Sequence, residues 1–326
     1  MATGLLSQLG LSVETTYGTY VAPNRFLEFD SEGVSRQPVY LTSTGLKAGR
    51  RIPSIDRHRE TTRSAGGDIT LKVPTRNFGV ILDMLHGNSV TPVQQAATTA
   101  YLQTHNIGLS APDSKSRTFQ IARPQVGGTV KPFSYLGSKI TNISFSCDVG
   151  GELMTTFTID AQDEVTAQTL ATASYTADTT SYLFTQATAT IGSSTALVRN
   201  FNLGVPMPLD TERYGLSATA LKAAPQNNDY IRPTMSFTAE YLDDVLYNHF
   251  VNSDEIAVTV SFEGATIATT YKDKISFTVA GAKVTGATPP VNGPGLLTID
   301  TPLEIFDASA GGTPLVIAYM STDVTI

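Results

Sequence analysis

Two successive segments near the middle of the chain alternate between apolar and polar residues over an unusual length. They cover residues 139–148 and 152–162 and are joined by the turn Val149-Gly150-Gly151. Ten residues of strand span about 33 Å, whereas strands usually have five or six residues. One face is apolar. The other is built of small hydroxyls, amides and carboxylates, and its only cation is Lys139 at the end of the strand. Such a hairpin must bury one face and leave the other in water.

The rest of the composition favours the same kind of structure. Only 16% of the 326 residues are charged, against about 25% in ordinary soluble domains. Thr, Val, Ile, Tyr and Phe favour strands, and 26 Gly and 17 Pro residues supply turns between them. We therefore expect a mainly β protein with long loops.

Several classes of protein are excluded by charge and by cysteine content. Lys and Arg total 22 against 29 for Asp and Glu, a net charge of −7, whereas a protein that grips nucleic acid over a broad face is basic. The single cysteine, Cys147, forms no intramolecular disulfide. The apolar runs are far shorter than the ~20 residues of a membrane helix, and the N-terminus has no signal-peptide pattern. We expect a chain made without export and without a membrane partner.

No pattern in the sequence predicts catalysis. The four histidines, His58, His86, His105 and His249, have no metal-ligand spacing. A nucleophile elbow, a P-loop and a dinucleotide fingerprint are all missing. We therefore expect neither an enzyme nor a cofactor or metal.

The cationic residues of this weakly charged chain are concentrated in one stretch. Residues 45–65 form an expected basic loop that holds 6 of the 22 cationic residues, namely Lys47, Arg50, Arg51, Arg57, Arg59 and Arg63. Either it is a solvated loop or it docks on an acidic partner, which could be another copy of the chain. Residues 1–24 are expected to be an extended arm that becomes ordered on assembly. The helical stripe over residues 78–85 predicts a helix that lies on a sheet.

Three motifs together resemble a known family. The first is Glu14-Thr15-Thr16-Tyr17-Gly18-Thr19 with Ala22-Pro23, followed by residues 29–35 and a loop that ends near Arg50-Arg51. The second is Gly66-Gly67-Asp68-Ile69 before the helix at 78–85 and Gly87. The third is Tyr135-Leu136-Gly137-Ser138-Lys139-Ile140 before the hairpin. In order and spacing over most of residues 11–265, they resemble the tail tube (major tail) proteins of long, non-contractile-tailed bacteriophages.

The resemblance implies a tail-tube-type β-sandwich or barrel subunit with one principal flanking helix. The chain would then consist of an extended N-terminal arm (1–24), a tube domain (25–265) and a C-terminal β segment of the same domain (266–326). Such subunits form rings that stack into a tube with a shared inner β-barrel, through which DNA is ejected into the host. Some relatives use a duplicated subunit in trimeric rings; because the sequence shows no repeat, we expect six copies. The implied location is the virion tail, assembled in the host cytoplasm. The implied partners are the chain itself, the tape measure protein, the tail terminator and the distal tail or baseplate proteins.

The wet face of the hairpin would then line the channel, where neutral or acidic side chains let DNA pass without binding it. We expect the lumen to be lined by Asn142, Ser144, Ser146, Asp148, Glu152, Thr156, Thr158, Asp160 and Glu240. Contacts between rings or subunits are expected from Glu14, Tyr17, Arg50, Arg51, Arg57 and Arg59. The alternatives are a β-rich decoration protein or adhesin, and, less favoured without tryptophan platforms, a carbohydrate-active enzyme.

Overall fold

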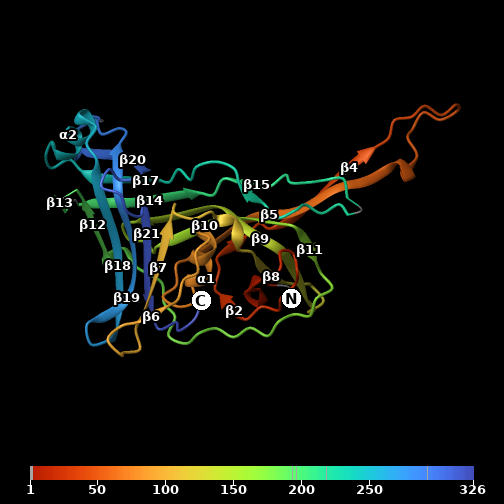
Figure 1. Ribbon diagram of the computed structural model, residues 1–326, viewed down its shortest axis with the longest axis horizontal. Helices are drawn as coiled ribbons and strands as arrows, with labels where there is room; N and C mark the ends of the chain where they lie inside the picture. The colour runs from red at the N-terminus through yellow and green to blue at the C-terminus, as the bar shows by residue number, and fades with distance from the viewer. Residues whose placement is uncertain (1–2, 193, 196, 218, 292) are drawn as a thin grey trace.

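The computed structural model describes residues 3–192, 194–195, 197–217, 219–291 and 293–326. The chain is mainly β, as expected, and 19 of the described strands form one extended antiparallel sheet system that stays open (Figure 1), while two short strands pair separately. No helix among the described residues is both long and apolar enough to cross a membrane.

Eight elements occur twice in the same order, and we call the two sets unit 1 and unit 2. Unit 1 consists of β1 (Gln8–Val13), β4 (Ser35–Thr42), β5 (His58–Lys72), α1 (Gly79–Leu82), β8 (Arg117–Pro124), β9 (Val130–Asp148), β10 (Met154–Ala161) and β11 (Asp163–Val165). Unit 2 consists of β12 (Ala187–Ile191), β14 (Val198–Pro206), β17 (Thr234–Glu240), α2 (Val245–Asn252), β18 (Ile256–Ala268), β19 (Tyr271–Val284), β20 (Thr298–Phe306) and β21 (Leu315–Ser321).

The two units also repeat the same strand pairings. In unit 1, β1 pairs with β8, β4 with β5, β5 with β10, and β9 with β8, β10 and β11. In unit 2, the corresponding pairs are β12–β18, β14–β17, β17–β20, and β19 with β18, β20 and β21. The expectation that the chain has no internal repeat is therefore wrong, because the topology is duplicated although the residues are not.

Shorter elements complete the chain. The remaining strands are β2 (Arg25–Leu27), β3 (Ser31–Glu32), β6 (Val93–Gln94), β7 (Tyr101–Ile107), β13 (Ser194–Thr195), β15 (Leu209–Asp210) and β16 (Gln226–Asn227). The 3-10 turns are η1 (Gly4–Leu6), η2 (Ile55–Arg57), η3 (Asp83–Leu85), η4 (Pro112–Ser114) and η5 (Phe184–Gln186). The helix expected at residues 78–85 is thus one turn of α-helix, α1, followed by the 3-10 turn η3.

The units join through two strand pairs. The second half of β9 pairs with β14, from Asn142 opposite Pro206 to Asp148 opposite Asn200. The strand β7, which lies between η3 and β8 in the chain, pairs with β21 of unit 2. Between them lies a shared core in which Phe145 contacts Phe277, with ring centroids 4.9 Å apart.

The strand β9 belongs to two layers. Its first half pairs with β8 and β11, and its second half pairs with β10 and β14. Gly137 lies just before the change of partners and has φ 64°, a conformation that favours glycine. A Cβ there would lie 2.9 Å from the ring of Tyr17, so the close approach also requires glycine.

The N-terminal segment is not a free arm. Residues 8–13 form β1, which lies between β2 and β8, and Leu9 and Leu11 are fully buried. Burial of these leucines gives the segment a place in the core without any partner chain.

A hairpin of β4 and β5 projects far beyond the other elements (right side of Figure 1). We call residues 37–64 of this hairpin the arm. The expected loop at 45–65 is wrong for its last part, because residues 58–65 belong to β5.

Candidate functional site

A broad polar face covers the sheet around the hairpin β9–β10. Along residues 142–148 of β9 and along β10, the side chains alternate between buried and more exposed positions, as the sequence predicts. Residues 134–140 of β9 are all buried, so the alternation expected from residue 139 begins later, after a bulge in the pairing with β10. The same alternation continues outward, so that the face runs over six paired strands in the order β5, β10, β9, β14, β17 and β20. We call it the polar face. Of the nine residues expected at a lumen, seven belong to its central strands: Asn142, Ser144, Ser146, Asp148, Thr156, Thr158 and Asp160.

Side chains on the polar face bond to one another across the strands. The hydroxyls of Thr70 and Thr156 lie 2.9 Å apart, and the hydroxyl of Thr158 donates to Asp68 over 2.6 Å. In unit 2, the hydroxyl of Thr238 donates to Asp300 over 2.7 Å. Because these groups satisfy one another, the face is held in place before any partner binds.

The cations beside this face are paired with carboxylates. The sequence did not show that Lys72 of β5 lies on the face; its Nζ is 2.8 Å from Glu152. The hydrogen bond from Lys72 holds the pKa of Glu152 below its usual range. At the other end, Arg199 lies 3.0 Å from Glu240. Both pairs are partly exposed and contribute little stability, but they neutralise the two positive charges.

Asp160 is covered within the chain. Its carboxylate accepts from the ammonium of Lys222, whose side chain is 1% exposed. Burial raises the pKa of Asp160, and Lys222 opposes this shift. Lys222 comes from the long loop 207–233, which lies over the end of β10. Asp160 therefore serves the contact between the two units, a role that no local pattern indicated.

The arm carries exposed basic and apolar side chains. Arg50 and Arg51 lie in the loop at its tip, and Leu46, Ile52 and Ile55 are 103%, 82% and 91% exposed. Within and next to this loop, Arg57 donates to the carbonyl of Gly45 and Arg59 to that of Asp56.

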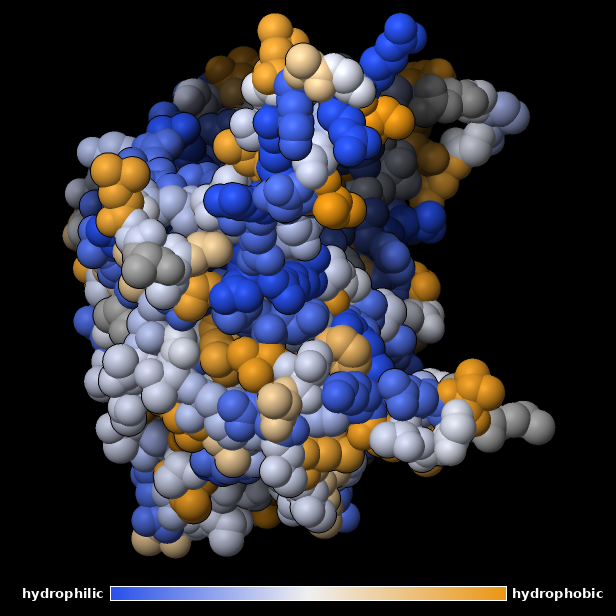
Figure 2. All heavy atoms as spheres, turned by 90° about the vertical axis from the view of Figure 1, so that its right-hand side faces the viewer, coloured by the Kyte–Doolittle hydropathy of each residue, from blue (hydrophilic) through white to orange (hydrophobic). Residues whose placement is uncertain are grey.

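The surface at the end of the molecule from which the arm projects is mixed in character. Figure 2 faces this end and shows hydrophobic side chains scattered among strongly hydrophilic ones. A surface of this kind suits polar docking between partners better than burial in a core.

Glu14 is an internal residue. Its carboxylate accepts hydrogen bonds from the backbone N–H groups of Gly18 (3.1 Å) and Gly137 (2.8 Å). The hydroxyls of Ser116 and Thr118 donate to it over 2.7 and 2.8 Å. Glu14 is 8% exposed, so its place at a subunit contact was wrongly expected: it ties β1 to β8 and to the bend of β9.

Tyr17 is also directed inward. Its ring lies against Gly137 and 5.7 Å from the ammonium of Lys139, and its hydroxyl is buried. Burial raises the pKa of Tyr17 well above its usual range. The motif at residues 14–19 therefore fixes a turn within the subunit.

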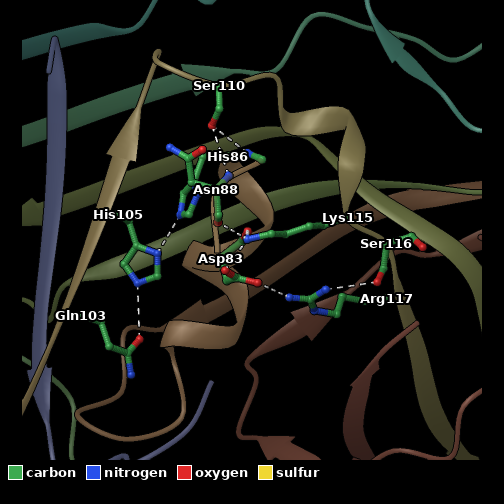
Figure 3. Close-up of polar contacts among 10 residues, drawn as sticks. Asp83, His86, Asn88, Gln103, His105, Ser110, Lys115, Ser116 and Arg117 are labelled. Atoms are coloured by element: carbon green, nitrogen blue, oxygen red, sulfur yellow. Dashed lines mark hydrogen bonds and ion pairs between the residues drawn. The ribbon is translucent and has the colours of Figure 1, made fainter. Parts of the chain in front are cut away.

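A buried polar cluster lies under η3 (Figure 3). The carboxylate of Asp83 accepts from Arg117 and from Lys115, each over 2.5 Å. Nearby, the rings of His86 and His105 are joined by a 3.0 Å hydrogen bond between Nε2 and Nδ1. Burial lowers the pKa of His86 to about 4 and that of His105 to about 3, so both rings are neutral at pH 7.

This cluster has a structural role. It joins η3 to β7 and β8, and Asp83 is paired with the buried Arg117 and with the partly exposed Lys115. The described residues contain no group of three or more His, Cys, Asp or Glu side chains that could hold a metal ion.

A wide polar face, open strand edges and a projecting arm define a mainly β protein whose surfaces suit contact with other chains. A family model described as phage tail tube protein matches residues 4–310. The match covers nearly the whole chain, which therefore belongs to this family of structural components of the bacteriophage tail. No curated protein matches the chain.

Proposed function

We propose that copies of this chain close into rings of six tube units, and that the rings stack into the tail tube through which DNA is ejected. The polar face carries this proposal. It is wide and hydrogen-bonded across strands, and it lies on the outside of a sheet whose other face forms the core. In a closed ring, such a face becomes the wall of a channel.

The chemistry of the face suits the passage of duplex DNA. DNA carries about one negative charge per 1.7 Å, and a cationic wall would hold it through release of counterions. Hydroxyls, amides and carboxylates offer no such attraction. Lys72 and Arg199 are each neutralised by a glutamate. The expected lumen residues Asn142, Ser144, Ser146, Asp148, Glu152, Thr156, Thr158 and Glu240 meet this demand, and DNA would pass without specific binding.

Contacts between copies would come from the arm. Its residues Arg50, Arg51, Arg57 and Arg59 are basic, whereas the chain as a whole is acidic, so a second copy is a suitable partner. As in the sequence-based expectation, assembly would take place in the host cytoplasm. The tube would then meet the tape measure protein inside and the terminator and distal tail proteins at its ends.

Electron microscopy of the purified chain tests this function directly. Uniform tubes of constant diameter are the expected result, formed above a threshold concentration. Single particles at every concentration would overturn the proposal, and decoration of a capsid or of a finished tail would support the alternative of a decoration protein or adhesin.

The lining of the channel is tested with added positive charge. Ser144→Lys with Ser236→Lys places two cations on the polar face. Val126→Lys with Leu5→Lys adds the same charge at loop positions that are 84% and 93% exposed. The first variant should form tubes that retain short duplex DNA at low salt and release it as salt rises; the second should not. Equal retention by both variants, or by neither, would contradict the assignment.

A further inference from the structure

One of the two strand pairs that join the units is made by a strand that occurs once. The strand β7 lies between η3 and β8, whereas α2 of unit 2 leads to β18 without an inserted strand. All of β7 pairs with β21, from Tyr101 opposite Ser321 to Ile107 opposite Leu315 (Figure 1). On its other side, β7 pairs with the two-residue strand β6. Opening of β7 would therefore remove one connection between the units and leave the β9–β14 pairing.

The inner face of β7 carries mostly polar side chains. Gln103 and His105 are fully buried there, beside the buried Ile107. Each end of β7 leads into a loop, 88–99 or 108–111, whose residues are exposed or half-buried. A segment with few buried apolar contacts and exposed connections opens locally before the whole chain unfolds.

A chain of hydrogen bonds connects β7 to η3 through two buried rings (Figure 3). The Nε2 of His105 lies 3.3 Å from the Oε1 of Gln103, and its Nδ1 lies 3.0 Å from the Nε2 of His86, the residue that follows η3. Both histidines are 0% exposed. Because both rings are neutral at pH 7, one proton lies between their facing nitrogens. We call these two residues the histidine pair.

On one side, the histidine pair faces charges that are already balanced among themselves. The side chains whose charges act on the rings are Asp83 of η3 and Lys115 of the segment before β8. Asp83 binds both Lys115 and Arg117 of β8, so its carboxylate is shared by two cations. A proton added to the pair would therefore place a net positive charge in a buried site beside a second cation.

On the other side, the histidine pair faces uncharged groups. The residues of β21 opposite His105 and Gln103 are Ile317 and Tyr319, and burial raises the pKa of Tyr319 well above its usual range. The helix α1 packs so closely that a Cβ at Gly79 would collide with the amide of Gln103. Neither β21 nor α1 contains a carboxylate, so neither element can balance a charged ring.

We propose that β7 is an acid-sensitive latch between the two units. When the histidine pair takes up protons, the rings reach water through release of β7 from β21 and η3, while the β9–β14 pairing stays closed. The turn η3 stays in place, because its residues are buried and Asp83 remains bound to Arg117. This inference concerns the single chain and is independent of the proposed function.

The direction and size of the effect follow from the protonation of the rings. In the closed state, burial lowers the pKa of His86 to about 4 and that of His105 to about 3, whereas an exposed histidine has a pKa of about 6.5. The open state therefore binds protons first, and opening becomes more favourable as the pH falls below about 6.5. Between pH 7 and pH 5, the ratio of open to closed β7 rises about 20-fold for each ring.

Hydrogen exchange of the full chain, corrected for the intrinsic effect of pH, tests the latch. Peptides that cover residues 101–107 should lose protection by at least about 20-fold between pH 7 and pH 5. Peptides that cover residues 142–148 and 200–206, which form the β9–β14 pairing, should keep theirs. Unchanged protection of β7, or an equal loss in both strand pairs, would overturn the inference.

The role of the rings is tested with variants that keep a hydrogen-bonding side chain. His105→Gln and, separately, His86→Gln replace one titrating ring with an amide, so each should reduce the effect of acid on β7 about 20-fold. The control is His249→Gln, because His249 lies on α2 and its Nδ1 is 2.9 Å from Asp254; it should leave the effect unchanged. An equal effect of acid in all three variants would assign the release of β7 to other groups.

A disulfide tests the release of β7 without changing the histidines. Thr104 and Ala318 lie opposite each other on the outer face of β7 and β21, so Thr104→Cys with Ala318→Cys should link the two strands. Cys147 is buried and does not compete. The oxidised variant should keep β7 protected at pH 5, and the same variant should regain the effect of acid after reduction. Loss of protection while the disulfide is intact would contradict the release of β7 from β21.

Discussion

The structure gives Glu14 a role inside the subunit. The substitution Glu14→Gln tests this role against a role in assembly. The four donors on its carboxylate divide into Thr118 and Gly137 on one oxygen and Gly18 and Ser116 on the other. A glutamine keeps one oxygen and turns an NH2 group toward the other two donors. The hydroxyl of Ser116 can rotate to accept, but the backbone N–H of Gly18 cannot.

Hydrogen bonds to a charged group contribute about 1.5–3 kcal/mol each. Two are lost and one is partly recovered, so the free energy of unfolding should fall by about 3 kcal/mol. The entropy of unfolding is about 2.1 cal/mol/K per residue, or about 0.7 kcal/mol/K for 326 residues. The expected fall in Tm is therefore about 4 °C, measured by calorimetry on the unassembled chain.

The matched control is Glu28→Gln, which removes the same charge at an exposed position and should leave Tm within about 1 °C. If Glu14→Gln unfolded at the temperature of the unmodified chain but failed to assemble, the carboxylate would belong to a subunit contact, and the reasoning from its four donors would be refuted.

Two further predictions concern buried charge. Lys222→Met leaves the carboxylate of Asp160 in a largely covered site without its partner and should cost about 3 kcal/mol in denaturant unfolding; Lys222→Met with Asp160→Asn should recover most of this, and equal losses in both variants would contradict the pairing. For His86 and His105, both folded pKa values lie below the usual histidine value of about 6.5, so the unfolded chain binds protons first and stability falls as pH drops from about 6.5 toward 4. The loss should reach about 2–3 kcal/mol per ring at pH 4.5, and His105→Gln should flatten the dependence of Tm on pH; an unchanged slope would rule the pair out as its source.

The sequence predicts best what depends on local periodicity. The alternation along residues 139–148 and 152–162 predicts the buried side of residues 142–148 and of β10, because a period of two fixes which residues share a face. It does not predict the bulge between Thr158 and Ile159, next to which Lys139 and Ile140 are both buried. The polar face could therefore be found from sequence at its centre. Its outer strands could not, because the pairing of Asn142 with Pro206 and of Thr238 with Asp300 joins distant segments.

The duplication escaped detection because equivalent elements lie in different environments. All four residues of α1 are buried, whereas α2 has no buried residue. A buried helix and a surface helix need different residues, so the two units can share a topology without sharing a sequence pattern. Glu14 was assigned to a subunit contact, and Lys222 was not identified, for a related reason. A charged residue is assigned to the surface unless its distant partners are known.

The covalent link between the two units has a kinetic consequence. The β9–β14 pairing forms within one chain, where the tether holds the second unit at an effective concentration that dilution does not lower. The two units therefore meet at a rate that does not depend on how much of the protein is present. Their contact survives dilution that would separate two unlinked chains joined by the same strand pair.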